Sequence, residues 1–365
     1  MKNDLNLAVS ALNHFQITGT LRGCAPYGNG HINDTFCAFT EDAHSKRRRY
    51  ILQAINQTVF SRPDKVMENI EGVIEHLHTK TDDPRAVMTL VPTVDGHAFY
   101  TDENGGCWRL YDFVEDSLCL ERPESNEDFY QSALAFGQFQ RDLSDFPAEN
   151  LNETIPNFHN TPVRYQRFLE AVKADKCGRA KDVADEIRFV TDRADFYSVL
   201  LDAHKAGELP LRVSHNDTKI NNVLLDADTR SALCVIDLDT IMPGFSVTDF
   251  GDSIRFGAST AAEDEKDLSK VWMDLELFKT YTAGFLAGCG GSLPNSEILL
   301  LPEGAKMMTI ECGMRFLTDY LEGDTYFRIH YPTHNLDRCR TQFKLVADME
   351  EKWDDMKAAV ANYCR

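Results

Sequence analysis

A strongly polar run interrupts two apolar segments in the middle of the chain. Residues 214–222 read "SHNDTKINN" and contain Asp217, Lys219 and Asn222, while a further acid, Asp237, ends the next apolar segment, "LCVIDLDT". A polar loop would explain the run alone. Phosphoryl transfer, however, needs such a set: a carboxylate for the acceptor hydroxyl, oxygen ligands for Mg²⁺ and a cation beside the moving group. We therefore predict phosphoryl transfer, with Asp217 as the catalytic base and Lys219 as the cation. Asn222 and Asp237 would be the metal ligands.

The spacing of these residues separates this interpretation from two others. Protein kinases keep the same separation between the catalytic Asp and a metal-binding Asn, and place a second metal-binding Asp further on. Asp237 and Asp239 also resemble the nucleophile strand of aspartyl phosphatases and the D-x-D motif of glycosyltransferases. A nucleophile strand usually opens its fold, whereas this one lies two-thirds of the way along the chain. We therefore favour phosphoryl transfer, and we expect His215 to brace the loop rather than to react.

A glycine-containing turn stands near the start of the chain. Within "YGNGHIN", residues 27–33, Gly28 and Gly30 allow a tight turn whose backbone N–H groups can approach phosphates. A G-x-G pattern alone also fits a simple hairpin turn. His31 and Asn33 follow directly, and they would face the substrate if the turn covers the site.

Two later helical patterns carry charged residues. Glu311, Arg315 and Asp319 recur at four-residue spacing, which predicts a row of salt bridges on a helix surface. Asp249, in "TDFGDSIRFGAST", would either cap its own helix or brace the catalytic loop.

The elements that must position these residues fall into two groups. A β-rich first part, residues 1–114, precedes a mainly helical part, residues 115–365, so we expect an α+β architecture of two lobes with the site between them. The expected helices, which share apolar positions at three- and four-residue spacing, are 1–16, 63–79, 126–146, 163–176, 183–206, 271–288, 304–321 and 336–362. The expected strands are 19–28, 31–40, 47–55, 86–94, 97–101 and 107–114, with a further β-rich segment at 210–240.

Composition excludes several kinds of partner. The chain of 365 residues carries a net charge of −20, and such a surface repels nucleic acid and anionic membranes. No window approaches the roughly 20 apolar residues of a membrane span, and the N-terminal residues do not read as a secretion signal. Ten cysteines without a C-x-x-C pair indicate a reducing, cytoplasmic location. In the absence of an oligomerisation repeat, we expect a monomer.

Longer strings resemble a known family. "PYGNGHIN", "RYILQAIN", "HNDTKINN", "IDLDTIMPG", "FGDSIRFGASTAAEDEKDLSK" and "ECGMRFLTDYLEGDTYF" are similar to the aminoglycoside phosphotransferase/choline kinase superfamily. More closely, they resemble the bacterial N-acetylhexosamine 1-kinases. The resemblance implies a protein-kinase-like bilobal fold and ATP with Mg²⁺. It also implies phosphorylation of the anomeric hydroxyl of N-acetylglucosamine or N-acetylgalactosamine.

The resemblance also implies site residues. Asp217 would again be the base, and Asn222 and Asp237 would be the metal ligands. Contacts to adenine would come from a hinge formed by Tyr111, Phe113 and Val114. The sugar pocket would be lined by His31, Arg315 and Tyr326, which replaces the salt-bridge interpretation of Arg315.

One position departs from the kinase pattern. Protein kinases carry a lysine on the third strand that holds the nucleotide phosphates and pairs with a helix Glu. Here Gln53 stands at that position, and a neutral amide cannot form an ion pair with Glu71. Lys219 or the glycine turn would have to supply part of what is missing. Two alternatives follow: a kinase for another small hydroxyl substrate, such as an aminoglycoside, choline or homoserine, or a nucleotide-binding pseudokinase scaffold.

Overall fold

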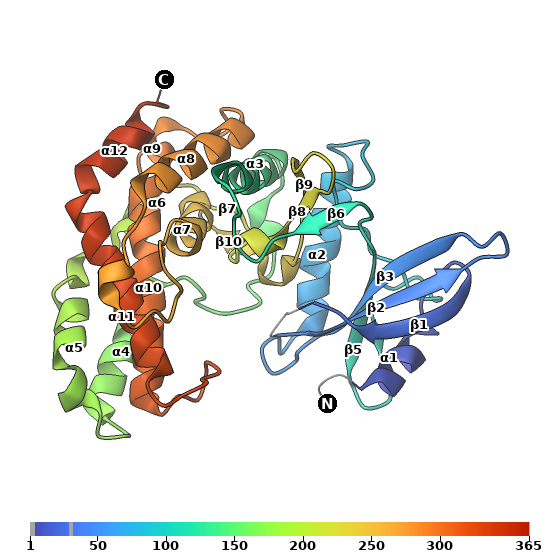
Figure 1. Ribbon diagram of the computed structural model, residues 1–365, viewed down its shortest axis with the longest axis horizontal. Helices are drawn as coiled ribbons and strands as arrows, with labels where there is room; N and C mark the ends of the chain where they lie inside the picture. The colour runs from blue at the N-terminus through green and yellow to red at the C-terminus, as the bar shows by residue number, and fades with distance from the viewer. Residues whose placement is uncertain (1–3, 29–31, 365) are drawn as a thin grey trace.

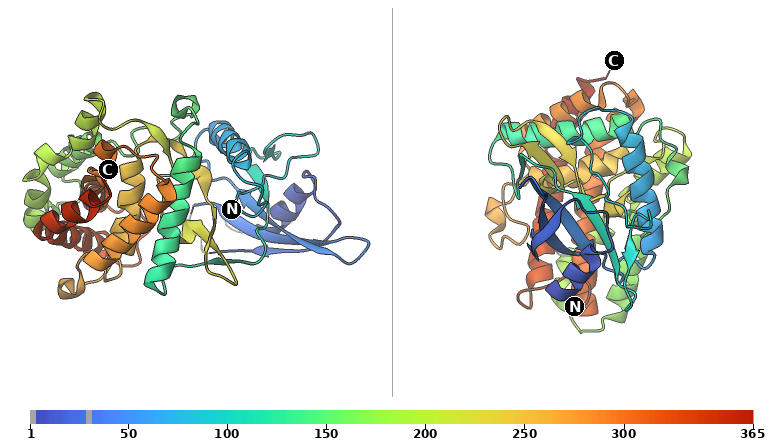
Figure 2. Two further views of the ribbon diagram at one scale, coloured as in Figure 1. Left: turned by 90° about the horizontal axis from the view of Figure 1, so that it is seen from above. Right: turned by 90° about the vertical axis from the view of Figure 1, so that its right-hand side faces the viewer.

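The molecule consists of a smaller sheet-containing lobe and a larger helical lobe (Figure 1). The computed structural model describes residues 4–28 and 32–364. The two lobes lie end to end along the long axis, as the view from above shows (Figure 2). The predicted α+β architecture, a small β-rich lobe followed by a larger helical one, is therefore confirmed. The exact division at residue 114 stays a prediction.

The smaller lobe is built on an antiparallel sheet with the strand order β1-β2-β3-β5-β4. Its elements are α1 (Leu5–Leu12), β1 (Thr20–Pro26), β2 (Asp34–Glu41), β3 (Arg47–Ala54), α2 (Pro63–His78), β4 (Tyr100–Thr101) and β5 (Cys107–Asp112). Successive side chains on a strand point to opposite faces. Tyr50 and Leu52 of β3 accordingly pack in one hydrophobic cluster with α1, whereas Ile51 of β3 and Tyr111 of β5 pack in another with α2.

One predicted strand of the smaller lobe is wrong. Residues 86–94 form only isolated bridges, such as Leu90 with Tyr111, although they run beside β5. Val91 donates to the carbonyl of Leu110 at 2.8 Å, but the next residue, Pro92, has no N–H group to continue a ladder. The predicted strand 97–101 is shortened to β4.

The larger lobe contains the predicted helices, two of them interrupted. Its helices are α3 (Asn126–Asp142), α4 (Thr161–Ala174), α5 (Ala184–Thr191), α6 (Val199–Lys205), α7 (Ser246–Gly257), α8 (Leu275–Cys289), α9 (Asn295–Ile298), α10 (Leu301–Glu322), α11 (His334–Glu351) and α12 (Trp353–Ala361). The prediction of one continuous helix at 183–206 and another at 336–362 is wrong, because each of these segments is divided into two α-helices. At 336–362 the apolar spacing continues across the break because Met349 of α11 and Met356 of α12 are both fully buried.

Short strands lie around the polar run or pair with the strands that flank it. They are β6 (Ser117–Cys119), β7 (Arg212–Ser214), β8 (Val223–Asp226), β9 (Ala232–Val235) and β10 (Met242–Gly244). β7 pairs with β10, and β6 pairs with the β8–β9 hairpin. The β-rich segment predicted at 210–240 is therefore confirmed, and the polar run lies between β7 and β8.

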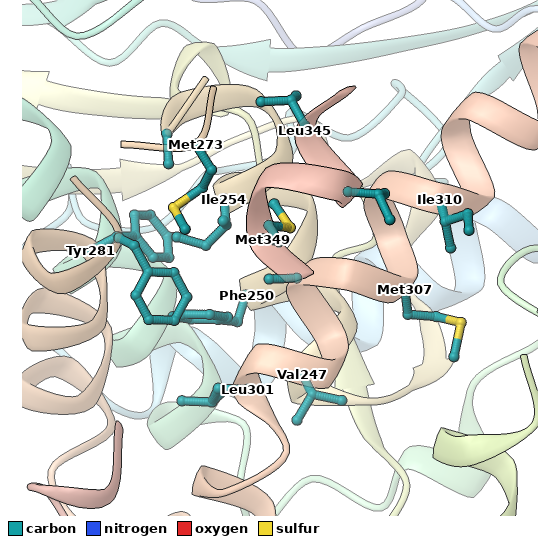
Figure 3. Packing of buried hydrophobic residues seen from close by; sticks show 14 of the residues in the cluster. Val247, Phe250, Ile254, Met273, Tyr281, Leu301, Met307, Ile310, Leu345 and Met349 are labelled. Carbon is teal, nitrogen blue, oxygen red and sulfur yellow. The ribbon is translucent and has the colours of Figure 1, made fainter. Parts of the chain in front are cut away.

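Helix α7 is fixed by close packing against α10. Figure 3 shows Val247, Phe250 and Ile254 of α7 in the same cluster as residues of α10 and α11. Gly251 of α7 meets the carbonyl of Gly304 on α10 so closely that an added Cβ would collide with it. The two helices can approach to this distance because both positions lack a side chain, and α7 is thereby held beneath the polar run.

Helix α2 belongs to the smaller lobe but packs on segments of the larger one. Ile70 and Val73 share a hydrophobic cluster with Val213, Leu238 and Ile241. The lobes are thus joined by apolar packing near the polar run. Across residues 4–28 and 32–364, none of the helices combines the length and the apolar character that a bilayer crossing requires.

Candidate active site

The polar run is held from beneath by one buried carboxylate. Asp249, on α7, accepts hydrogen bonds from Ser214 Oγ at 2.9 Å and from the backbone N–H of His215 at 2.8 Å. The backbone N–H of Asn216 and the side chain of Gln140 also donate to it, at 2.8 and 2.9 Å. Asp249 lies inside α7 and not at its N-cap. Of the two roles considered from the sequence, the structure shows that Asp249 braces the loop.

His215 ties the loop to the end of the neighbouring strand. Its ring is fully buried and lies edge-on to Phe136 and Phe139. The backbone N–H of Asp217 donates to Nδ1 at 3.3 Å, so the ring proton sits on Nε2, which lies 2.9 Å from the carbonyl oxygen of Ile236. His215 therefore orients the backbone of Asp217, and its predicted bracing role is confirmed.

The predicted base, Asp217, lies against two of the residues predicted to act with it. Its Oδ1 is 2.7 Å from Lys219 Nζ, and Asn222 Nδ2 donates to its backbone oxygen at 2.8 Å and to Oδ2 at 3.2 Å. The side chains of Asp217 and Lys219 are 24% and 35% exposed, so both are accessible to a substrate. Burial opposes the charge on Lys219, but the carboxylates of Asp217 and Asp252 outweigh this effect and raise the pKa of Lys219. The ammonium group therefore stays charged at neutral pH.

The two predicted metal ligands, Asn222 and Asp237, lie at one end of the β8–β9 hairpin. They are brought together because the backbone N–H of Ile236 donates to the carbonyl of Asn222 at 2.9 Å. Asp237 has a left-handed backbone, with φ of 62°, and remains open to solvent. The protein that surrounds its carboxylate on the other sides, together with Asp239 and Asp217, raises the pKa of Asp237. A divalent cation would offset this accumulation of negative charge.

This donor set fits Mg²⁺ held together with a nucleotide. Within residues 4–28 and 32–364, no three His, Cys, Asp or Glu side chains gather as a complete metal site. Mg²⁺ commonly takes one or two protein ligands and completes its shell with water and substrate phosphates. Because Asn222 Nδ2 donates to Asp217, the Oδ1 atom of Asn222 stays available as a metal ligand. Asp237 adds a carboxylate.

Asp239 connects the two lobes. It is buried, forms an ion pair with Arg109 Nη1, and accepts a hydrogen bond from Asn33 Nδ2 at 2.5 Å. Asn33 Oδ1 in turn accepts from the backbone N–H of Asn56 at 2.9 Å. The structure thus engages both ends of the Asn33 amide with protein, and the predicted substrate contact of Asn33 stays a prediction. The sequence interpretation missed Arg109, although a charged residue in the apolar strand "CWRLYDFV" marks a buried charge.

The glycine turn begins beside the predicted hinge. Gly28 has a left-handed backbone with φ of +75°, which suits glycine. The ring of Tyr27 lies edge-on to Phe113, with centroids 5.9 Å apart. Gly30 and His31, predicted to contact phosphate and sugar, lie outside the described residues.

The hinge residues differ in what their side chains do. Tyr111 is buried, its hydroxyl finds no partner in the described part of the chain, and burial raises the pKa of Tyr111. The guanidinium of Arg49 lies 3.7 Å above the ring of Phe113. The carbonyl of Val114 accepts from Ser117 Oγ at 2.7 Å. The backbone of Tyr111 is paired with Ile51 of β3, and the hinge role of all three residues stays a prediction.

Arg315 does not belong to a salt-bridge row. Glu311 Oε1 lies 3.0 Å from His159 Nδ1, and Asp319 accepts hydrogen bonds from the backbone N–H groups of residues 325–327. In the described ranges, no carboxylate lies within ion-pair distance of Arg315. The predicted row is wrong because each neighbouring carboxylate anchors a loop beside the helix instead.

The guanidinium of Arg315 faces aromatic rings. Its central carbon lies 5.8, 5.9 and 5.5 Å from the ring centroids of Phe158, Tyr326 and Phe327. Arg315 and Tyr326, both predicted to bind the substrate, line one small hollow of about 40 Å³ together with Arg164. Burial and the neighbouring charge of Arg315 lower the pKa of Arg164. The local charge here is therefore positive, although the whole chain is strongly acidic.

A family profile spans parts of both lobes and the whole of the polar run. The sequence profile of the phosphotransferase enzyme family (APH) matches residues 23–270, a span that runs from β1 past α7 and includes Asp217, Asn222 and Asp237. Because the match covers more than half of the chain, the protein belongs to this family. The resemblance to the aminoglycoside phosphotransferase/choline kinase superfamily is confirmed at this level.

Solved structures share the fold at low sequence identity. A microcompartment-associated aminopropanol kinase has a TM-score of 0.63 at 17% identity, over 97% of this chain and 99% of that one. An aminoglycoside phosphotransferase from Alicyclobacillus acidocaldarius has a TM-score of 0.62 at 13% identity, over 97% and 95%. An amicoumacin kinase in complex with AMP-PNP, Ca²⁺ and Ami has a TM-score of 0.56 at 11% identity, over 99% and 94%. The predicted protein-kinase-like bilobal fold is thus confirmed.

Proposed function

We propose that the protein is an ATP- and Mg²⁺-dependent kinase for the anomeric hydroxyl of N-acetylglucosamine or N-acetylgalactosamine. The product would be the sugar 1-phosphate. The observation that carries the proposal is the grouping of Asp217 with Lys219 and Asn222 within hydrogen-bond distance, next to the solvent-accessible Asp237. Membership of the phosphotransferase family supports the reaction class, and the longer sequence strings support the acceptor.

Asp217 would act on the acceptor. Its carboxylate, held by Lys219 and Asn222, accepts the proton of the sugar hydroxyl while the new O–P bond forms and the bond to ADP breaks. The charged Lys219 offsets negative charge on the group in transit. When bound, Mg²⁺ would neutralise charge on the nucleotide phosphates, and Asn222 Oδ1 and Asp237 would hold it.

The acceptor side favours a neutral substrate over a cationic one. Three arginines and two carboxylates line the hollow. The carboxylate of Asp319 is occupied by backbone N–H groups and that of Glu322 is paired with Arg167, which leaves Arg164 and Arg315 without an ion-pair partner among the described residues. A quaternary ammonium such as choline, or the amines of an aminoglycoside, would be repelled by this charge. Neutral hydroxyl and amide groups can instead accept hydrogen bonds from a guanidinium. The hollow of about 40 Å³ has room for a small neutral substituent of the substrate.

The proposal is tested by measuring ADP release with a panel of acceptors. The panel contains N-acetylglucosamine, N-acetylgalactosamine, glucose, galactose, choline and an aminoglycoside, each with ATP and Mg²⁺. We expect turnover with the N-acetylhexosamines, and phosphorus NMR should show the phosphate on the anomeric carbon. Preferred turnover of choline or an aminoglycoside would contradict the sugar assignment. Nucleotide binding without ADP release from any acceptor would support the scaffold alternative.

A further inference from the structure

A fully buried arginine lies in the middle of the smaller lobe's sheet. Arg109, on β5, has a side chain that is 1% exposed. It stands opposite Gln53 in the pairing of β3 with β5. Residues that are directly opposite on antiparallel strands point to the same face. Arg109 therefore projects on the face where a lysine at position 53 would project.

The guanidinium of Arg109 bridges the sheet and the turn that follows β9. Its Nε and Nη2 groups donate to Gln53 Oε1 at 2.9 and 2.8 Å. Its Nη1 forms the ion pair with Asp239, whose other oxygen is bonded to Asn33. Two residues of the sheet lobe thus hold one carboxylate of the larger lobe. A lysine at 109 would present a single point charge and could not reproduce this fork.

Asp239 is two residues from Asp237, within a single tight turn. The segment passes from the left-handed backbone of Asp237 into the short 3₁₀ helix Leu238–Thr240. A restraint on Asp239 therefore also restrains where the carboxylate of Asp237 points.

We propose that Arg109, which projects on the face where the third-strand lysine of kinases would lie, is a positioning residue that holds the turn carrying Asp237 for the metal of the bound nucleotide. This inference rests on the proposed kinase function. Arg109 acts through Asp239 and not by touching the phosphates, because its donors already face Gln53 and Asp239 and its side chain is closed to solvent.

A double-mutant cycle on the full-length protein tests the inference. The variants are Arg109→Met, Asp239→Asn and the two combined, and calorimetry gives the Kd of ATP with Mg²⁺ and with EDTA. We expect each single change to reduce the Mg²⁺-dependent gain in ATP affinity at least tenfold. The double variant should lie within twofold of the single variants, because both changes break one link. Arg22→Met, on β1 of the same sheet, is the matched control and should leave both Kd values unchanged.

Two patterns of loss in the variants would overturn the inference. An equal loss of ATP affinity with and without Mg²⁺ would mean that Arg109 contacts the phosphates itself. If the fold losses in ATP affinity of the two single variants multiply in the double variant, Arg109 does not act through Asp239. If Arg109→Met does not fold because it leaves a buried carboxylate unpaired, the comparison of Asp239→Asn with the double variant decides. A further tenfold loss upon adding Arg109→Met would then contradict the inference, and a change below twofold would support it.

The failure of this inference can be told apart from failure of the proposed function. Wild-type protein that binds ATP with a Mg²⁺-dependent gain, but releases no ADP with any acceptor, contradicts the kinase proposal alone. Wild-type protein that phosphorylates an N-acetylhexosamine, while the Arg109 and Asp239 variants keep the full Mg²⁺-dependent gain, contradicts the inference alone.

Discussion

Asp217 is surrounded by donors that fix the position of its carboxylate and backbone. Lys219 and Asn222 contact its carboxylate, and His215 fixes its backbone N–H. We expect Asp217→Asn to lower kcat by about 10²–10⁴-fold, because an amide cannot accept the proton of the acceptor. The Kd of ATP should change little, since in the proposal Asp217 acts on the acceptor. Single-turnover kinetics and calorimetry on the same preparation measure both quantities, and a kcat near the wild-type value would contradict the assignment.

Arg315 offers a separate test on the acceptor side. Replacing it by alanine removes a guanidinium that forms no ion pair with a carboxylate of the described residues, so we expect the KM of the sugar to rise about tenfold. The KM of ATP should stay the same. Arg188→Ala, an exposed residue of α5 paired with Asp185, is the control and should leave both values unchanged. Equal increases in both KM values would indicate a loss of structure and not of an acceptor contact.

The sequence identifies those site residues that lie close to one another along the chain. Asp217, Lys219 and Asn222 lie within six positions of one another, so their joint role is visible from one string. Arg109 and Asp239 are different, because their contact joins a strand of one lobe to a turn of the other. Only a charge in the middle of an apolar strand signalled Arg109, and nothing in the sequence named its partner.

At the level of elements, periodicity located helices better than it located their ends. An apolar stripe continues across the break between α11 and α12 because both helices face the same core. Residues 86–94 have the composition of a strand, but the proline after Val91 prevents a continuous ladder. Tertiary contacts decide both cases, and a single sequence does not contain them.

The close contact of α7 with α10 leads to a stability prediction. We expect Gly251→Ala to lower the free energy of unfolding by about 1–3 kcal/mol, because the added methyl group meets the backbone of Gly304 and pushes the helices apart. Gly72→Ala, inside α2, is the matched control. Its Cβ would find only ordinary contacts, so it should be neutral or stabilise the protein by up to about 1 kcal/mol through helix propensity. Urea titration of both variants measures the difference, and equal effects would contradict the packing argument.

For the whole molecule, the contacts between the lobes imply that they unfold together. The cluster around α2 includes Val213 and Leu238 of the larger lobe, and Asn69 Nδ2 donates to the carbonyl of Ile241 at 2.9 Å. The ion pair of Arg109 with Asp239 adds a buried link. Separating the lobes would expose this apolar surface and leave buried charges unpaired, so neither lobe should persist when the other unfolds.

The three tryptophans allow each lobe to be followed separately. Trp108 lies in the sheet lobe, and Trp272 and Trp353 lie in the helical lobe. One variant retains only Trp108, with phenylalanine at the other two positions, and the second variant replaces Trp108 alone. For each variant, the urea midpoint from circular dichroism is subtracted from the urea midpoint from fluorescence. We expect the two differences to agree within about 0.3 M. A sheet-lobe midpoint lower by 1 M or more would mean that the lobes are independent units, and the contacts of Asp239 would then be too weak to hold the turn of Asp237 in place.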